Sequence, residues 1–200
     1  MTSLDKPFAF NKDDCSWYTP FYCEENIYRL GCALKQLEPS ANFEIVFISN
    51  EHKKIPLWAQ KNGSSDDSMP VIWDYHVILF QSTESAVTCV YDLDTVLPFP
   101  VSCSEYMLKA LKPSIIKTLP KQYHRLFRVI PGHSFLTHFA SDRSHMFKDN
   151  VWMAEPPKTS CIATQDSIMN LPEYFNMTTN TNHPVFGKVL TESELIARYS

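Results

Sequence analysis

Two apolar runs lie close together within residues 71–97, VIWDYHVILFQSTESAVTCVYDLDTVL, and the polar stretch QSTES separates them. Runs rich in Val, Ile, Leu and Tyr around a polar centre predict a β-hairpin, here with its centre near Glu84. That register places His76 opposite Asp92, where Cβ atoms are roughly 4.5 to 5.5 Å apart. We therefore expect the imidazole and the carboxylate to share a hydrogen bond, unless a one-residue slip moves them to opposite faces.

Before the hairpin, four apolar residues at helical spacing form one stripe: Ile27, Leu30, Leu34 and Leu37. Thr19 and Pro20 suit the N-cap and the first position of a helix, and Pro39 ends the pattern. These signals predict a helix over residues 21–37 that buries the stripe in the core. Cys23 then lies in the first turn of that helix.

The remaining segments alternate between expected strands and helices. FEIVFIS at residues 43–49 is apolar on both faces apart from Glu44, which predicts an inner strand of a covered sheet. Ser104 and Ser134 can each cap a helix. Further strands are expected at 55–58 and 126–130, and further helices at 104–112, 135–139, 171–177 and 192–199.

This alternation predicts a mixed α/β (α+β) fold, a sandwich with a central, largely antiparallel sheet flanked by helices. No repeat or linker divides the chain, so we expect one domain over residues 1–200. Residues 1–18 show no period and are expected to form an irregular covering segment. Trp17 and Tyr18 in that segment are expected to pack near a cleft.

Composition agrees with one globular unit, since 44% of the 200 residues are hydrophobic and 20% are charged. The formal charge of -4 offers no basic footprint for nucleic acid or for an anionic membrane. No apolar run approaches the length of a membrane span, and the first residues lack a secretory signal. We therefore expect a protein of the cytoplasm and nucleus, without membrane or nucleic-acid partners.

Six cysteines lie at positions 15, 23, 32, 89, 103 and 161. They form neither a CxxC pair nor a cluster at zinc-finger spacing, so no metal site is expected from them. Cytosolic thiols stay reduced, and most of these cysteines are expected to be small buried hydrophobes.

Cys23, His76 and Asp92 together suit nucleophilic catalysis. A thiolate is the nucleophile, and a helix N-terminus supplies about 0.3 to 1 kcal/mol, less than the roughly 1.4 kcal/mol that one pKa unit needs. A nearby imidazole is the stronger activator, with the carboxylate fixing its tautomer. Each residue also has a structural interpretation: a buried thiol, a hydrogen-bonded core histidine and a carboxylate that pairs with an arginine or ends a strand.

Five blocks of the chain resemble the WDYHV-motif family, the protein N-terminal glutamine amidohydrolases. The blocks are YCEENI at 22–27, FISNE at 47–51, WDYHV at 73–77, YDLDTVLPFP at 91–100 and FASDRSHM at 139–146. They span most of the chain in the expected order, and departures are confined to the flanks. The family's catalytic Cys, His and Asp fall on Cys23, His76 and Asp92.

The resemblance implies a core related to papain-like and transglutaminase enzymes, with the Cys at the start of a helix. It implies hydrolysis of the side-chain amide of an N-terminal glutamine to glutamate, with release of ammonia, in the N-degron pathway that leads through arginylation to degradation. The expected partners are proteins or peptides with a free N-terminal Gln. No metal or organic cofactor is expected, and we expect a monomer.

Recognition of a free α-amino group calls for an acceptor, and Glu25 and Asp142 are the candidates. Either carboxylate could instead be solvated or structural. A cysteine protease or a transglutaminase-type acyltransferase that acts on internal sites would share the triad. A non-catalytic interaction module would bury an unreactive Cys23.

Overall fold

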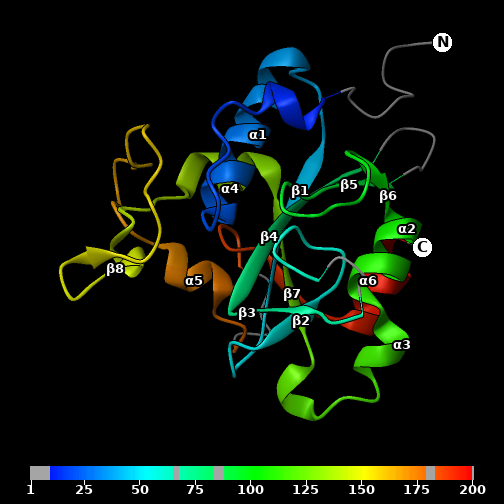
Figure 1. Ribbon diagram of the computed structural model, residues 1–200. Helices are drawn as coiled ribbons and strands as arrows, with labels where there is room; N and C mark the ends of the chain where they lie inside the picture. The colour runs from blue at the N-terminus through cyan, green and yellow to red at the C-terminus, as the bar shows by residue number, and fades with distance from the viewer. Residues whose placement is uncertain (1–9, 65–67, 83–87, 179–182, 200) are drawn as a thin grey trace.

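The computed structural model describes residues 10–64, 68–82, 88–178 and 183–199. A six-stranded antiparallel sheet in the order β10-β7-β1-β4-β5-β6 runs through these residues, with helices on both faces (Figure 1). Its strands are β1 (Phe43–Ser49), β4 (Tyr75–Ser82), β5 (Thr88–Tyr91), β6 (Val101–Ser102), β7 (Leu126–Pro131) and β10 (Lys188–Thr191). The mixed α/β class with a large antiparallel sheet between helices is confirmed, whereas the relation to papain-like enzymes stays a prediction.

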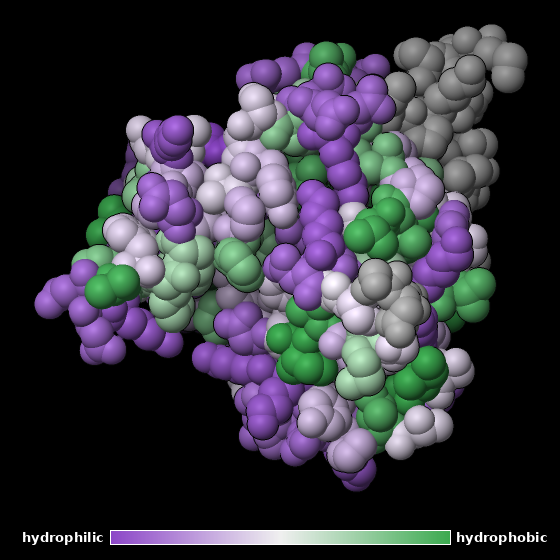
Figure 2. Space-filling model, in the orientation of Figure 1, coloured by the Kyte–Doolittle hydropathy of each residue, from purple (hydrophilic) through white to green (hydrophobic). Residues whose placement is uncertain are grey.

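Two hydrophobic clusters fill the two sides of the sheet. The first packs beneath α1 (Cys23–Leu37), α4 (Gly132–His138) and α5 (Leu171–Phe175), and the second beneath α2 (Cys103–Tyr106), the π-helical turn Met107–Leu111 and α6 (Glu192–Tyr199). The remaining elements are α3 (Pro113–Ile116), the two-stranded pairs β2 (Ile55–Leu57) with β3 (Val71–Trp73) and β8 (Phe147–Lys148) with β9 (Val151–Trp152), and 3₁₀ turns at Lys12–Asp14, Lys121–Tyr123 and Ser144–Met146. Figure 2 shows polar and apolar side chains interspersed over the face seen in Figure 1.

The strand expected at 43–49 is confirmed with the predicted bounds. It pairs with β4 on one side and β7 on the other, and six of its seven residues are buried, Glu44 being the partly exposed one. A strand covered on both faces can carry apolar side chains at every position, which is why it lacks the alternation of a half-exposed strand. β1 therefore forms the centre on which both clusters are built.

The predicted hairpin is confirmed as the antiparallel pair β4–β5, but its register differs by two residues. Leu79 stands opposite Tyr91, whereas a centre at Glu84 would have placed it opposite Cys89. A shift of two residues keeps every side chain on its predicted face, because the side-chain period of a strand is two. The turn itself, residues 83–87, lies outside the described residues.

The first long helix begins at Cys23, later than the expected start at residue 21. Phe21 has a φ of +69°, a left-handed conformation that interrupts the helix after Pro20. Thr19 does not cap the helix end as predicted. Its backbone N–H donates to Asn26 Oδ1 at 2.9 Å, and Asn26 Nδ2 donates back to its carbonyl at 2.7 Å. This brace holds the entering chain so that Cys23 is the first helical residue.

Three smaller predictions about helices are wrong. Leu37 is 64% exposed, while Leu34 of the same stripe is fully buried, because the helix ends as it leaves the sheet. Ser102 rather than Ser104 caps α2, through a hydrogen bond from the Glu105 N–H. Ser134 lies inside α4 and donates to the carbonyl of Val185 instead of capping.

The two C-terminal helices agree better with prediction. A helix was expected at 171–177 and α5 occupies Leu171–Phe175, while α6 has the predicted start at residue 192. Thr191 and Glu194 form the predicted capping box, with reciprocal hydrogen bonds between side chain and backbone. Across the described residues, no helix combines the length and apolarity that crossing a bilayer requires.

Leu34 and Leu37 form a matched pair that tests the position of α1. Leu34→Ala is expected to lower the free energy of unfolding by about 2 to 5 kcal/mol, because it empties buried volume. Leu37→Ala is expected to change it by less than about 0.5 kcal/mol. Urea unfolding of both variants measures the difference. Equal losses would contradict the way α1 lies on the sheet.

Candidate active site

A cleft of about 550 Å³ opens where the N-terminus of α1 meets the start of β4. Residues from distant parts of the chain line it, among them Cys23, Trp73, Asp74, Tyr75, His145 and Met153. Three of the family-like sequence blocks therefore meet in one place. The cleft has both apolar walls and ionisable groups, as sites for small polar ligands do.

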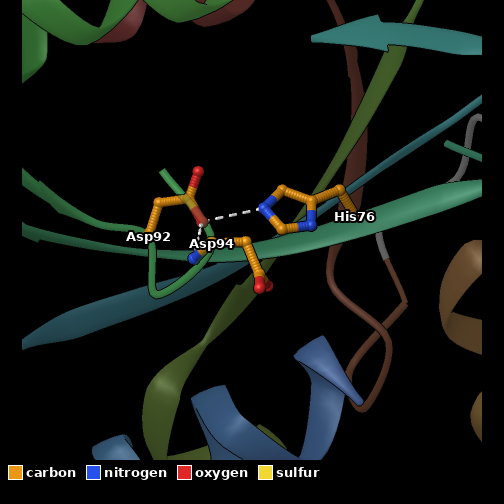
Figure 3. A group of neighbouring side chains, drawn as sticks. All are labelled: His76, Asp92 and Asp94. Atoms are coloured by element: carbon orange, nitrogen blue, oxygen red, sulfur yellow. Dashed lines mark hydrogen bonds and ion pairs between the residues drawn. The ribbon is translucent and has the colours of Figure 1, made fainter. Parts of the chain in front are cut away.

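His76 and Asp92 lie just beneath this cleft and are both fully buried. The Nε2 atom of the imidazole is 2.9 Å from Oδ1 of the carboxylate, so the predicted hydrogen bond is present (Figure 3). Asp92 follows the last paired residue of β5, Tyr91, and turns back toward β4. The pair therefore forms at the open end of the hairpin, not within its ladder.

The Asp92 carboxylate accepts three further hydrogen bonds. The hydroxyl of Tyr106 donates to Oδ2 at 2.8 Å, the amide of Gln60 donates to Oδ2 at 3.2 Å, and the backbone N–H of Asp94 donates to Oδ1 at 2.9 Å. Burial raises the pKa of Asp92, but His76, the Asp94 N–H and Gln60 lower it, to about 2. Asp92 is therefore an anion at neutral pH, held by donors from four segments of the chain.

The same interaction governs His76. Burial lowers the pKa of the imidazole, while the Asp92 charge and its hydrogen bond raise it, and the net shift is upward. Because Asp92 can only accept, Nε2 carries a hydrogen and Nδ1 is left as the atom that can exchange a proton. Nδ1 is buried without a hydrogen-bond partner, and the ring stacks on Trp73 at a centroid distance of 5.0 Å.

Cys23 approaches the same region from the helix. It is 4% exposed, and the backbone N–H of Val77, the residue after His76, is hydrogen-bonded to its sulfur. The thiol itself lies 3.7 Å from Oε2 of Glu24 and is directed at that carboxylate. Burial, Glu24 and other nearby carboxylates raise the pKa of the Cys23 thiol well above its ordinary value, so its deprotonation requires a base.

Glu24 was not among the site residues predicted from the sequence. It is fully buried, and burial raises its pKa to about 7. Oε2 accepts the Tyr75 hydroxyl at 2.9 Å, whereas Oε1 has no hydrogen-bond partner and lies 3.6 Å from Nε2 of His145. In the sequence, Glu24 offered no signal beyond its place next to Cys23.

The two carboxylates predicted to bind an α-amino group both accept hydrogen bonds from other parts of the protein. Glu25 accepts two hydrogen bonds from the guanidinium of Arg143, at 2.7 and 2.9 Å, in a buried ion pair. Asp142 accepts the backbone N–H of Ser144 at 2.9 Å. Neither carboxylate is among the residues that line the cleft. The ion pair instead fastens the start of α1 to the segment that carries His145.

Gln60 and Tyr106 are the other residues that sequence reasoning missed. They lie 32 and 14 residues from Asp92 along the chain, and neither belongs to a recognisable pattern. Trp17 and Tyr18 do line a cavity, of about 610 Å³, beside the cleft, as expected. The Tyr18 hydroxyl donates to Asp94 at 2.6 Å, which connects this covering segment to the site.

His76, Asp92 and Asp94 also lie close enough together to hold a metal ion, with ligand atoms within 4.8 Å of one another (Figure 3). The donor set argues for another use of these atoms. Both oxygens of Asp92 already accept two hydrogen bonds each, one of them from the imidazole nitrogen that would face the ion. The imidazole and carboxylate atoms of this cluster are therefore engaged in hydrogen bonds with each other and with neighbouring donors, not arranged as free metal ligands.

All six cysteines lie within the described residues and none is in a disulfide. Cys15, Cys23, Cys89 and Cys103 are buried, which confirms that most of them are core residues, and Cys161 is exposed.

The fold and the site define an α/β protein with a buried cysteine at a helix N-terminus beside a hydrogen-bonded His–Asp pair, the groups that thiol-dependent acyl transfer employs. The sequence model of the N-terminal glutamine amidase family matches residues 18–199, and the chain belongs to that family. Comparison with curated proteins agrees. Proteins named protein N-terminal glutamine amidohydrolase from Danio rerio, Homo sapiens and Arabidopsis thaliana are each 42% identical to it. These alignments cover 91%, 97% and 80% of this chain and 88%, 92% and 75% of the relatives.

The His76–Asp92 pair can be tested by titration. We expect His76 to titrate above the ordinary pKa of about 6.5 in the native protein. Asp92→Asn removes the charge that raises this pKa and leaves burial, so the imidazole should lose its proton at lower pH. NMR of protein labelled in its histidine rings measures both values, with His76→Gln assigning the signal. An unchanged pKa in Asp92→Asn would contradict the account.

Proposed function

We propose that this chain hydrolyses the side-chain amide of an N-terminal glutamine in proteins and peptides, yielding N-terminal glutamate and ammonia. The observation that carries the proposal is the His76–Asp92 hydrogen bond of 2.9 Å beneath a cleft that Cys23 lines, in a chain of the N-terminal glutamine amidase family. Relatives that carry the amidohydrolase name align with nearly the whole chain, which supports the same activity here.

In the first half of the proposed reaction, Cys23 turns from Glu24 toward Nδ1 of His76, which takes the thiol proton. The thiolate sulfur bonds to the side-chain carbonyl carbon, and backbone N–H groups at the start of α1 hold the oxyanion. His76 then returns its proton to the amide nitrogen, the C–N bond breaks, and ammonia leaves. The glutamyl group remains as a thioester on Cys23.

In the second half, His76 takes a proton from a water molecule, whose oxygen attacks the thioester carbon. The C–S bond breaks, the proton returns to the sulfur, and the glutamate side chain is released. Asp92 keeps the ring in one tautomer throughout and stabilises the imidazolium that forms twice. The scheme uses the three side chains and water, and it requires no metal or organic cofactor.

The product chain begins with glutamate. As the family resemblance implies, we propose that a reaction adding arginine to that terminus consumes it, within the N-degron pathway. A cytoplasmic or nuclear location and a monomeric state belong to the same proposal.

Cys23→Ala tests the activity directly. Ammonia release is measured from three matched peptides: one that begins with Gln, one that begins with Asn and one that carries Gln internally. We expect release from the first peptide, and loss of at least about 10³-fold in Cys23→Ala, because removal of a nucleophile leaves only binding and oxyanion stabilisation. The Asn peptide should be slower, by roughly 10 to 200-fold if a missing methylene alone decides.

Cys32→Ala is the matched control, a half-buried thiol on the same helix, and it should retain full activity. Release from the internal Gln would favour a transglutaminase-type enzyme. Equal activity of Cys23→Ala and Cys32→Ala would remove Cys23 from the mechanism.

A further inference from the structure

The proposed mechanism leaves one buried acid unused, although it touches the nucleophile. The Glu24 carboxylate is fully buried, and its Oε2 lies 3.7 Å from the Cys23 sulfur. Oε1 has no hydrogen-bond partner among the protein atoms. A buried, unsatisfied carboxylate oxygen costs free energy comparable to several hydrogen bonds, so its retention calls for an explanation.

Glu24 lies directly behind the wall of the cleft. It is not itself a lining residue, but Cys23, Tyr75 and His145 all line the cleft, and all three lie within 4 Å of its carboxylate. His145 is held through one ring nitrogen. Its Nε2 lies 3.4 Å from the Tyr75 hydroxyl and 3.6 Å from Oε1, and its Nδ1 has no hydrogen-bond partner. A ligand group that displaces this ring reaches Oε1.

We propose that Glu24 binds the free α-ammonium group of the substrate's N-terminal glutamine, so that it selects a chain terminus over an internal glutamine. The inference rests on the proposed function. In glutamine the α-nitrogen is four bonds from the side-chain carbonyl carbon, about 5 Å when extended. One substrate residue can therefore contact both the sulfur and the carboxylate, which lie side by side.

Asp74 is the competing acceptor, because it also lines the cleft. It is exposed, and one of its oxygens accepts the N–H of Tyr75. Exposed ion pairs contribute about 0 to 1 kcal/mol, too little for strong selection. A buried carboxylate with one unsatisfied oxygen rejects a substrate that lacks the cation far more strongly, since that oxygen then stays desolvated without a hydrogen bond. Burial therefore favours Glu24.

The test combines a change in the enzyme with a change in the substrate. Two peptides are compared, one that begins with glutamine and one that begins with a 4-carbamoylbutanoyl group, which is glutamine without its α-amino group. The wild type should favour the first by at least about 30-fold in kcat/KM. In Glu24→Gln this preference should fall to within about 3-fold, through loss on the amino peptide alone. Asp74→Asn should keep the wild-type preference.

The results distinguish failure of the proposed role of Glu24 from failure of the proposed function. Equal loss on both peptides in Glu24→Gln would mean a structural role and would overturn the inference, as would loss of the preference in Asp74→Asn. A wild-type preference that Glu24→Gln retains would overturn it as well. If the wild type releases no ammonia from the glutamine peptide, the proposed function fails instead. Thermal unfolding checks that each variant is folded.

Discussion

The buried hydrogen bond between His76 and Asp92 is the interaction on which the site depends. A carboxylate sealed from water needs compensation for its charge, and Asp92 obtains it from an imidazole, an amide, a phenol and a backbone N–H. These donors belong to β4, the loop after β2, α2 and the chain just past β5. The Asp92 carboxylate is therefore stabilised only when the hairpin, the helix and the loop are folded together. This constraint also fixes the position of the His76 imidazole.

The site holds two buried acids, Asp92 and Glu24, whose surroundings give them different pKa values. Asp92, paired with His76, has a pKa of about 2, whereas Glu24, buried without a cation, has a pKa of about 7. Asp92 is thus an anion at neutral pH that can stabilise an imidazolium. Glu24 is an acid that becomes charged more readily when a cation binds beside it. Division of acidic groups into different roles by their surroundings is a general way to obtain chemistry and recognition from the same residue type.

Local patterns in the sequence predicted much of this arrangement. The inner strand at 43–49 follows from an unbroken apolar run, and the face shared by His76 and Asp92 follows from strand periodicity even though the register is off by two residues. What local pattern could not supply was tertiary. The left-handed Phe21, the exposure of Leu37 and the donors Gln60 and Tyr106 depend on how distant segments pack. Glu25 was predicted to bind substrate because it lies next to the nucleophile in sequence, and no local pattern revealed its ion pair with Arg143, which is 118 residues away.

The central claim is that Cys23 attacks the side chain of an N-terminal glutamine. The most direct measurement uses a peptide whose first residue is 6-diazo-5-oxonorleucine, a glutamine analogue that alkylates the nucleophile of an amidase site, followed by mass-spectrometric peptide mapping. The account predicts one label per chain, on Cys23, prevented by an excess of a peptide that begins with glutamine. Labelling of Cys32 or Cys161 instead, or no label in a protein that hydrolyses the glutamine peptide, would contradict it.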